Sequence, residues 1–170
     1  MTISGATRSL FVVGDPIAHA RSPVLVTAAL ARRGVDAVLL PMRIAPADLG
    51  RFFDAVRIMQ SCDGVLVTMP HKEAVLGLVD DATPIARAAR ACNVVRREAS
   101  GRLVGDNMDG EGFARGLERR GYALAGRSVA LVGAGGAAAG IALALAARGV
   151  ASIAILNRTA ARAEDLAARV

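Results

Sequence analysis

Lys72 is the most informative residue for chemistry in this sequence. The chain has 21 lysine and arginine residues, and Lys72 is the only lysine among them. Arginine stays protonated at working pH, whereas a lysine can release its proton when its surroundings favour the neutral amine. Because nearly every other basic position is arginine, the lysine that remains is a candidate for proton transfer. The alternative is that Lys72 survives by chance and has no chemical role.

Further polar side chains gather in short segments at the ends of predicted strands. These segments are residues 19–23, 68–72, 92–93 and 105–110. Ligands of parallel α/β sheets collect outside the carboxyl ends of the strands. A lysine and an aspartate brought together there could hydrogen-bond a substrate hydroxyl and move its proton. Asp106 and Asp109 have a second interpretation as turn or N-cap residues, and Ser22 as the cap of a helix opened by Pro23.

A glycine-rich segment over residues 133–140 follows the predicted strand 128–132 and opens a predicted helix. Glycine is needed where the chain turns sharply and where backbone approaches a pyrophosphate, and the helix N-terminus offers free N–H groups to that anion. Glycine turns that serve packing alone also exist. The strand–loop–helix–strand context favours a dinucleotide site, and the lack of a following Gly-Lys-Ser/Thr excludes the ATPase type of phosphate loop.

The end of the next predicted strand favours NADP over NAD. An NAD site usually has an acidic residue there for the ribose 2′-hydroxyl. Here the strand 152–156 is followed by Asn157, Arg158 and Thr159, with Arg162 one helical turn later. Two guanidinium groups suit a 2′-phosphate. The alternative is that both are ordinary surface arginines.

The predicted elements alternate between strands and helices, which predicts an α/β fold with parallel sheet. Residues 129–147 carry no charge and are long enough for a membrane span. Their early glycines and β-branched start are better explained by a strand, a tight turn and an alanine-rich helix. Predicted strands cover residues 10–14, 37–42, 64–68, 93–97, 102–105, 128–132 and 152–156. Predicted helices cover residues 23–33, 46–59, 73–78, 84–91, 110–120, 136–148 and 160–169.

Composition limits the cellular compartment and the classes of binding partner that we expect. Apolar residues make up 54% of the 170 residues, so the chain can bury a core, and aromatic residues make up only 3%. The net charge of +6 comes from scattered arginines, whereas nucleic-acid binding needs clustered ones. Cys62 and Cys92 form neither a disulfide framework nor a zinc pattern, so no metal site is expected. With no export signal recognised at the N-terminus, a cytoplasmic protein is expected.

The ordered polar motifs resemble the shikimate/quinate dehydrogenase family over nearly the whole chain. The motifs that carry the resemblance are residues 14–23, 67–72, Asn93, residues 105–110, the glycine-rich segment and residues 157–159. The resemblance implies an NADP-dependent enzyme that interconverts 3-dehydroshikimate and shikimate, or a close analogue such as quinate. It implies a three-layer α/β substrate domain over residues 1–107, a connecting helix over 108–122 and an incomplete Rossmann-like domain over 123–170.

The resemblance also implies roles for individual residues. Lys72 matches the family's catalytic lysine, and Asp109 matches its partner aspartate. Matches to substrate-binding positions are Ser22, Thr68 and Asn93. Matches to the pyrophosphate turn are Gly133, Ala134, Gly135, Gly136 and Ala137. Matches to the adenosine-phosphate clamp of NADP are Asn157, Arg158, Thr159 and Arg162. The expected partners are a cyclic hydroxy acid and a second copy of the chain in a homodimer, without nucleic acid or membrane.

The sequence departs from the family pattern at three substrate positions and in length. Ala20, Leu66 and Met108 stand where the family usually has serine, asparagine and threonine. Each change removes a polar group near the substrate, and an unpaired buried hydroxyl costs about 1–3 kcal/mol. Family members continue for roughly 100 further residues, so the chain is expected to be a fragment of a longer protein or a truncated product. An alternative function is therefore a weakly active or non-catalytic member that binds a small polyol acid or a nucleotide.

Overall fold

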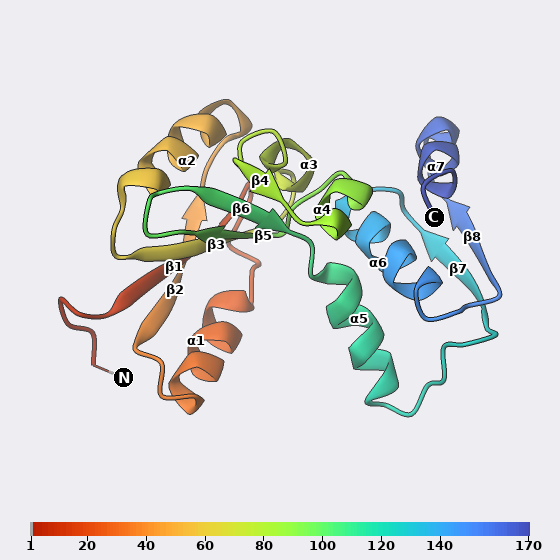
Figure 1. Cartoon of the computed structure of the whole chain (residues 1–170), viewed down its shortest axis with the longest axis horizontal. Helices are drawn as coiled ribbons and strands as arrows, with labels where there is room; N and C mark the ends of the chain where they lie inside the picture. The colour runs from red at the N-terminus through yellow and green to blue at the C-terminus, as the bar shows by residue number, and fades with distance from the viewer. Residues whose placement is uncertain (1) are drawn as a thin grey trace.

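The computed structural model describes residues 2–170, which contain two β-sheets flanked by helices (Figure 1). The first sheet has the strand order β2-β1-β3-β5-β6-β4, and the second consists of β7 and β8. The strands are β1 (Arg8–Gly14), β2 (Ala37–Arg43), β3 (Cys62–Val67), β4 (Asp81–Ala82), β5 (Val94–Arg97), β6 (Leu103–Asp106), β7 (Ser128–Val132) and β8 (Ser152–Leu156). The helices are α1 (Ser22–Arg32), α2 (Leu49–Ile58), α3 (Lys72–Val75), α4 (Pro84–Ala89), α5 (Asp109–Glu118), α6 (Gly136–Ala146) and α7 (Ala160–Ala167), and a 3₁₀ turn, Pro46–Asp48, precedes α2.

The predicted α/β fold class is confirmed, although the first sheet is mixed rather than wholly parallel. Strand β1 pairs in parallel with β2 and β3, whereas β5 runs antiparallel to both β3 and β6. The connection between β5 and β6 is too short for a crossover helix, so it forms a hairpin, with Gly101 at φ +86° in the left-handed region. The two-residue strand β4 was not predicted, because a segment that short has no periodicity to detect.

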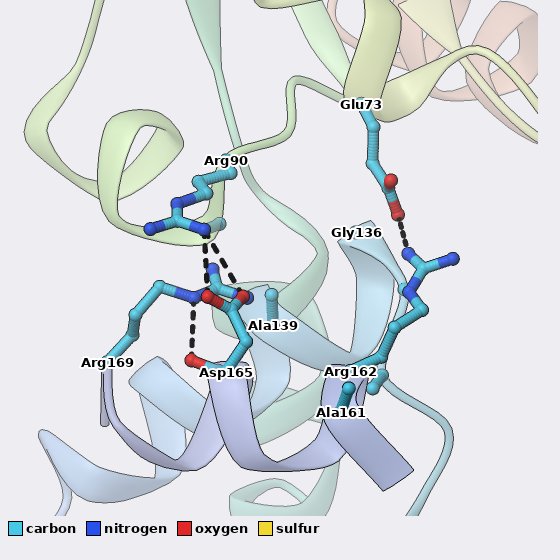
Figure 2. A pocket seen from close by; sticks show the side chains of 11 residues that line it. Glu73, Arg90, Gly136, Ala139, Ala161, Arg162, Asp165 and Arg169 are labelled. Carbon is cyan, nitrogen blue, oxygen red and sulfur yellow. Dashed lines mark hydrogen bonds and ion pairs between the residues drawn. The ribbon is translucent and has the colours of Figure 1, made fainter. Parts of the chain in front are cut away.

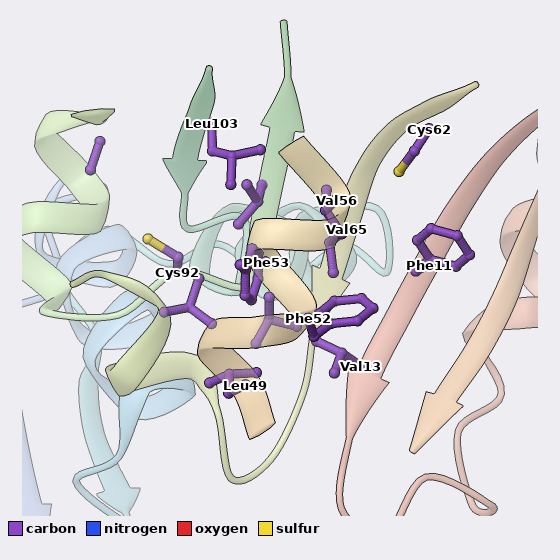
Figure 3. Packing of buried hydrophobic residues seen from close by; sticks show 14 of the residues in the cluster. Phe11, Val13, Leu49, Phe52, Phe53, Val56, Cys62, Val65, Cys92 and Leu103 are labelled. Carbon is purple, nitrogen blue, oxygen red and sulfur yellow. The ribbon is translucent and has the colours of Figure 1, made fainter. Parts of the chain in front are cut away.

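The core of the first sheet lies under α2. Alternate residues of β1 and β3 point to this face, among them Phe11, Val13 and Val65, and they pack against Phe52 and Phe53 of α2 (Figure 3). Two edge-to-face aromatic contacts order the cluster, with ring centroids 6.1 Å apart for Phe11 and Phe52 and 5.5 Å for Phe52 and Phe53. Helix α1 lies on the other side of the sheet (Figure 1), so this part of the chain has three layers.

Helices α6 and α7 pack on one face of the β7–β8 pair. Alternation along the two strands turns Leu131, Ile153 and Ile155 toward these helices. The opposite face leaves Val132 and Leu156 exposed, at 84% and 54%. The strand–turn–helix interpretation of residues 129–147 agrees with β7, a glycine turn and the 11-residue α6. Among residues 2–170, no helix has the length and apolarity needed to span a bilayer.

Close glycine contacts join the two halves of the chain. Gly110 of α5 is pressed against α6, since a Cβ on Gly110 would lie 1.9 Å from the Gly140 carbonyl oxygen. Arg148, just after α6, forms ion pairs with Glu111 and Glu118 of α5 at 2.9 and 2.7 Å. Strand β6 belongs to the first sheet and β7 to the second. The domain boundaries at 107/108 and 122/123 stay predictions.

Candidate active site

Lys72, Asp109 and Asn93 form one hydrogen-bonded cluster. The Lys72 Nζ lies 2.6 Å from Asp109 Oδ2. The other carboxylate oxygen, Oδ1, accepts a 2.7 Å hydrogen bond from Asn93 Nδ2. The ion pair is partly buried, with side-chain exposures of 19% for Lys72 and 22% for Asp109. An ammonium group held by an oriented carboxylate, with some access to solvent, can donate a proton to a bound oxygen atom.

The mixed sheet explains why these residues meet. Strand β3 ends at Val67, and Lys72 begins α3 shortly afterwards. Because β5 is antiparallel to β3, its start lies beside the end of β3, and the Val67 N–H donates to the Asn93 carbonyl oxygen at 2.8 Å. The end of β6 lies next to this point, where the Asn93 N–H donates to the Asp106 carbonyl oxygen at 3.0 Å. Asp109 follows on the first turn of α5.

The remaining predicted substrate residues lie at neighbouring strand ends. Thr68 lines the same crevice as Lys72, and its N–H donates to the Val13 carbonyl oxygen of β1 at 2.9 Å. Ser22 begins α1 after the loop that follows β1. Among residues 2–170, Ser22 has no side-chain hydrogen bond to the Lys72 cluster, so the structure brings Lys72, Asp109 and Asn93 into contact and leaves Ser22 outside that contact.

The glycine turn faces Lys72 across a crevice of about 530 Å³. Gly133 adopts φ +113°, which favours glycine, and no side chain caps the N-terminus of α6. A Cβ on Gly136 would lie 2.6 Å from Ala91 Cβ and 3.3 Å from Lys72 Cβ, so only glycine lets the turn approach this closely. The uncapped N–H groups of a helix and a close backbone turn fit a pyrophosphate. The crevice is lined by Thr68, Met69, Pro70, Lys72, Glu73, Val132, Gly135, Gly136, Ala137, Ala138 and Arg162.

The predicted adenosine-phosphate clamp lies at the end of β8. Asn157 Nδ2 donates to the Thr159 carbonyl oxygen at 2.9 Å, which shapes the turn into α7. Arg158 is exposed, whereas Arg162 forms an ion pair with Glu73 at 2.5 Å. A second cavity of about 290 Å³ lies beside this pair, where Arg90 and Arg169 both contact Asp165 (Figure 2). The four residues of the predicted clamp include two arginines and no acidic residue, which fits a 2′-phosphate, although the Glu73 carboxylate engages Arg162.

Two residues of this region had no assigned role in the sequence. Asn107 is only 3% exposed, and its Nδ2 donates to the carbonyl oxygens of Ala91 at 3.1 Å and Gly136 at 3.4 Å. Asn107 therefore connects the Lys72 cluster to the glycine turn. Its place in the motif 105–110 was the sequence feature that could have identified it. Glu73 contacts Arg162, which lies 89 positions away in the sequence. No local sequence pattern predicts such a contact.

Cys92 lies next to Asn93 but is not a candidate nucleophile. It is fully buried, and desolvation, followed by the nearby Asp106 carboxylate, raises the pKa of its thiol to about 11. A neutral, buried thiol is a poor nucleophile. A Cβ on Gly105 would lie 2.5 Å from Cys92 Sγ, so Cys92 serves to pack the end of β6.

The fold and site define an α/β protein in which a Rossmann-like glycine turn faces a lysine–aspartate pair from a second α/β unit. Two family models match the chain: the shikimate dehydrogenase substrate binding domain over residues 12–95, and shikimate / quinate 5-dehydrogenase over residues 117–170. The chain belongs to the shikimate/quinate dehydrogenase family. The predicted family is confirmed.

Similar proteins are known in sequence and in structure. The shikimate dehydrogenase (NADP(+)) of Geobacter metallireducens is 44% identical over 98% of this chain and 58% of its own length. The Thermus thermophilus enzyme, solved in complex with shikimate, has a TM-score of 0.88 and 34% identity over 96% of this chain and 61% of its own. A 5-ketofructose reductase of Gluconobacter has a TM-score of 0.85 and 34% identity over 96% of this chain and 58% of its own. The chain thus spans less than two thirds of these relatives.

Proposed function

We propose that the protein containing this chain is an NADP(H)-dependent oxidoreductase that interconverts 3-dehydroshikimate and shikimate, or a close analogue such as quinate. The observation that carries the proposal is the Lys72–Asp109 ion pair, 2.6 Å long, beside the glycine turn in one crevice. The relative from Geobacter metallireducens, named shikimate dehydrogenase (NADP(+)), supports the same reaction.

The chain supplies binding groups for the pyrophosphate and for the 2′-phosphate of the cofactor. The backbone from Gly133 to Ala137 binds the pyrophosphate through the uncapped N-terminus of α6. Asn157, Arg158, Thr159 and Arg162 hold the 2′-phosphate. When bound, the nicotinamide ring supplies the hydride for the substrate's C3 carbonyl carbon and accepts it in the reverse direction. Gly136 keeps the turn against the Lys72 stem, so the two binding regions share one crevice.

Lys72 Nζ moves the proton. During reduction, negative charge develops on the C3 oxygen, and the ammonium group stabilises this charge and donates its proton. During oxidation, Nζ takes the proton from the hydroxyl group. Asp109 holds Nζ in place, and Asn93 orients Asp109 by occupying its second oxygen.

The substrate pocket is less polar than the family pattern. Ser22 and Thr68 remain to bind the carboxylate and hydroxyl groups, while Leu66 on β3 is partly buried and Met108 is 47% exposed. With Ala20, these changes favour an analogue that needs fewer hydrogen bonds, or a weakly active binding protein. The name of the similar Gluconobacter protein, 5-ketofructose reductase, supports a range of substrates within this fold.

The absorbance of NADPH measures turnover by the full-length protein that contains this chain. The substrates to be tried are 3-dehydroshikimate, shikimate and quinate. Lys72→Met keeps the stem against Gly136 but removes the charge, and Lys72→Arg keeps the charge but cannot release a proton. We expect both variants to lose about 10²–10⁴-fold in turnover while retaining NADP+ binding. Turnover by Lys72→Arg within tenfold of the unaltered protein would contradict the role of Lys72. Absence of turnover with any cyclic hydroxy acid would favour the binding-protein alternative.

Compartment and assembly complete the proposal. Cys62 and Cys92 are both buried free thiols, as is usual for proteins of a reducing cytoplasm. The homodimer stays a prediction, which light scattering of the purified protein tests. The scattered arginines are paired with carboxylates in many places, which supports the expectation that nucleic acid is not a partner.

A further inference from the structure

An ion pair between Glu73 and Arg162, called here the Glu73–Arg162 bridge, spans the two halves of the chain. Glu73 follows Lys72 on α3, and Arg162 lies on the first turn of α7. Their closest atoms, Glu73 Oε1 and Arg162 Nη2, are 2.5 Å apart, and both side chains are about half exposed. Figure 2 shows the two side chains reaching toward each other from opposite sides. The bridge therefore links the element that carries Lys72 to the predicted adenosine-phosphate clamp.

The bridge lies at the place where the glycine turn would receive an anion. A Cβ on Gly135 would lie 3.9 Å from Glu73 Oε1, and Gly135 precedes the uncapped N-terminus of α6. Glu73 and Arg162 also line the crevice that contains Lys72 and Gly136. A carboxylate here gains from the positive end of the helix dipole. A pyrophosphate entering the same turn would meet a like charge.

The bridge also occupies Arg162. A guanidinium group binds phosphate best through two parallel N–H donors. Arg162 Nη2 donates a hydrogen bond to Glu73 Oε1. Arg162 must exchange this carboxylate for the 2′-phosphate before it can bind NADP in full. NAD lacks the 2′-phosphate, so it makes no use of a released Arg162.

We propose that Glu73 is a specificity-determining residue that weakens dinucleotide binding and limits the preference for NADP over NAD. Its carboxylate competes with the pyrophosphate at the glycine turn and with the 2′-phosphate at Arg162. This inference rests on the proposed NADP site. It concerns only residues of this chain and is independent of which substrate is reduced.

Equilibrium binding tests the proposal without a turnover measurement. Calorimetric titration with NADP+ and with NAD+ compares the full-length protein that contains this chain with its Glu73→Gln and Glu164→Gln variants. Glu164 is an exposed carboxylate of the same helix as Arg162, so its variant controls for the loss of one negative charge. We expect Glu73→Gln to bind NADP+ about two- to fivefold more tightly, the size set by releasing one exposed ion pair. NAD+ should gain less, and Glu164→Gln should change neither affinity.

Salt dependence separates electrostatic competition from a structural effect. The affinity ratio between Glu73→Gln and the unaltered protein should approach one as ionic strength rises, because exposed charges are screened. Unchanged or weaker NADP+ binding by Glu73→Gln overturns the inference, as does an equal gain for NADP+ and NAD+. NADP+ binding by the unaltered protein would still support the proposed function in those cases. If none of the proteins binds either dinucleotide, the proposed function and the inference both fail.

Discussion

Replacement of Gly110 by alanine tests how the helix that carries Asp109 is held in place. A Cβ at this position would lie 1.9 Å from the Gly140 carbonyl oxygen and 2.5 Å from the Gly140 carbonyl carbon. Ordinary van der Waals contact begins near 3.4 Å, and the obstructing atoms are backbone rather than a flexible side chain. Helix α5 must therefore move away from α6, and Asp109, the preceding residue, must move with it.

The size of the effect follows from two opposing terms. Alanine in place of glycine stabilises a helix by up to about 1 kcal/mol. Overpacking of a well-packed contact costs about 1–3 kcal/mol, and a collision with backbone belongs at the upper end. We therefore expect Gly110→Ala to lower the free energy of unfolding by about 2 kcal/mol.

Gly112 provides the matched control on the same helix. A Cβ on Gly112 would meet nothing within 4 Å, so Gly112→Ala should raise the free energy of unfolding by about 0.5–1 kcal/mol. Urea denaturation followed by circular dichroism measures both variants. The reasoning is refuted if Gly110→Ala proves as stable as Gly112→Ala, because the two changes would then differ in no way that α6 imposes.

Three further predictions concern buried groups and charge. Asn107→Ala should lower the free energy of unfolding by about 1–3 kcal/mol in urea denaturation, since it leaves the Ala91 carbonyl oxygen without this donor; a change within experimental error would contradict the role given to Asn107. The Cys92 thiol, whose pKa burial raises to about 11, should not react with a thiol reagent at pH 8 until urea unfolds the chain, and fast labelling of Cys92 in the folded protein would show that the site is open. Hydrogen bonds from Arg148, and then from Arg115, lower the pKa of Glu111, so its contribution to stability is present above the ordinary Glu pKa of about 4.3 and is lost as the pH falls through the lowered value. Thermal unfolding should accordingly be less sensitive to acid in Arg148→Gln than in the unaltered chain, and equal acid sensitivity would contradict this assignment.

Much of the fold and the site could be predicted from local sequence. Short continuous runs of apolar residues indicated β1 and β3, and the strand followed by glycines indicated β7, its turn and α6. The scarcity of lysine singled out Lys72, and the motif 105–110 singled out Asp109. These signals work because residue type and short spacing determine backbone preference and the available chemistry. The roles of the individual site residues stay predictions until binding and turnover are measured.

Other features depended on contacts between distant parts of the chain. The antiparallel β5, which places Asn93 beside the end of β3, follows from a hairpin pairing. Glu73 contacts Arg162 only because the tertiary fold brings their side chains, from α3 and α7, to the same crevice as the glycine turn. Gly110 and Gly112 are alike to any rule of helix propensity, yet only Gly110 touches a second helix. Residue type and short spacing therefore determined which groups are available, whereas packing between remote segments decided which groups meet, because contact distance depends on how whole helices and strands come together.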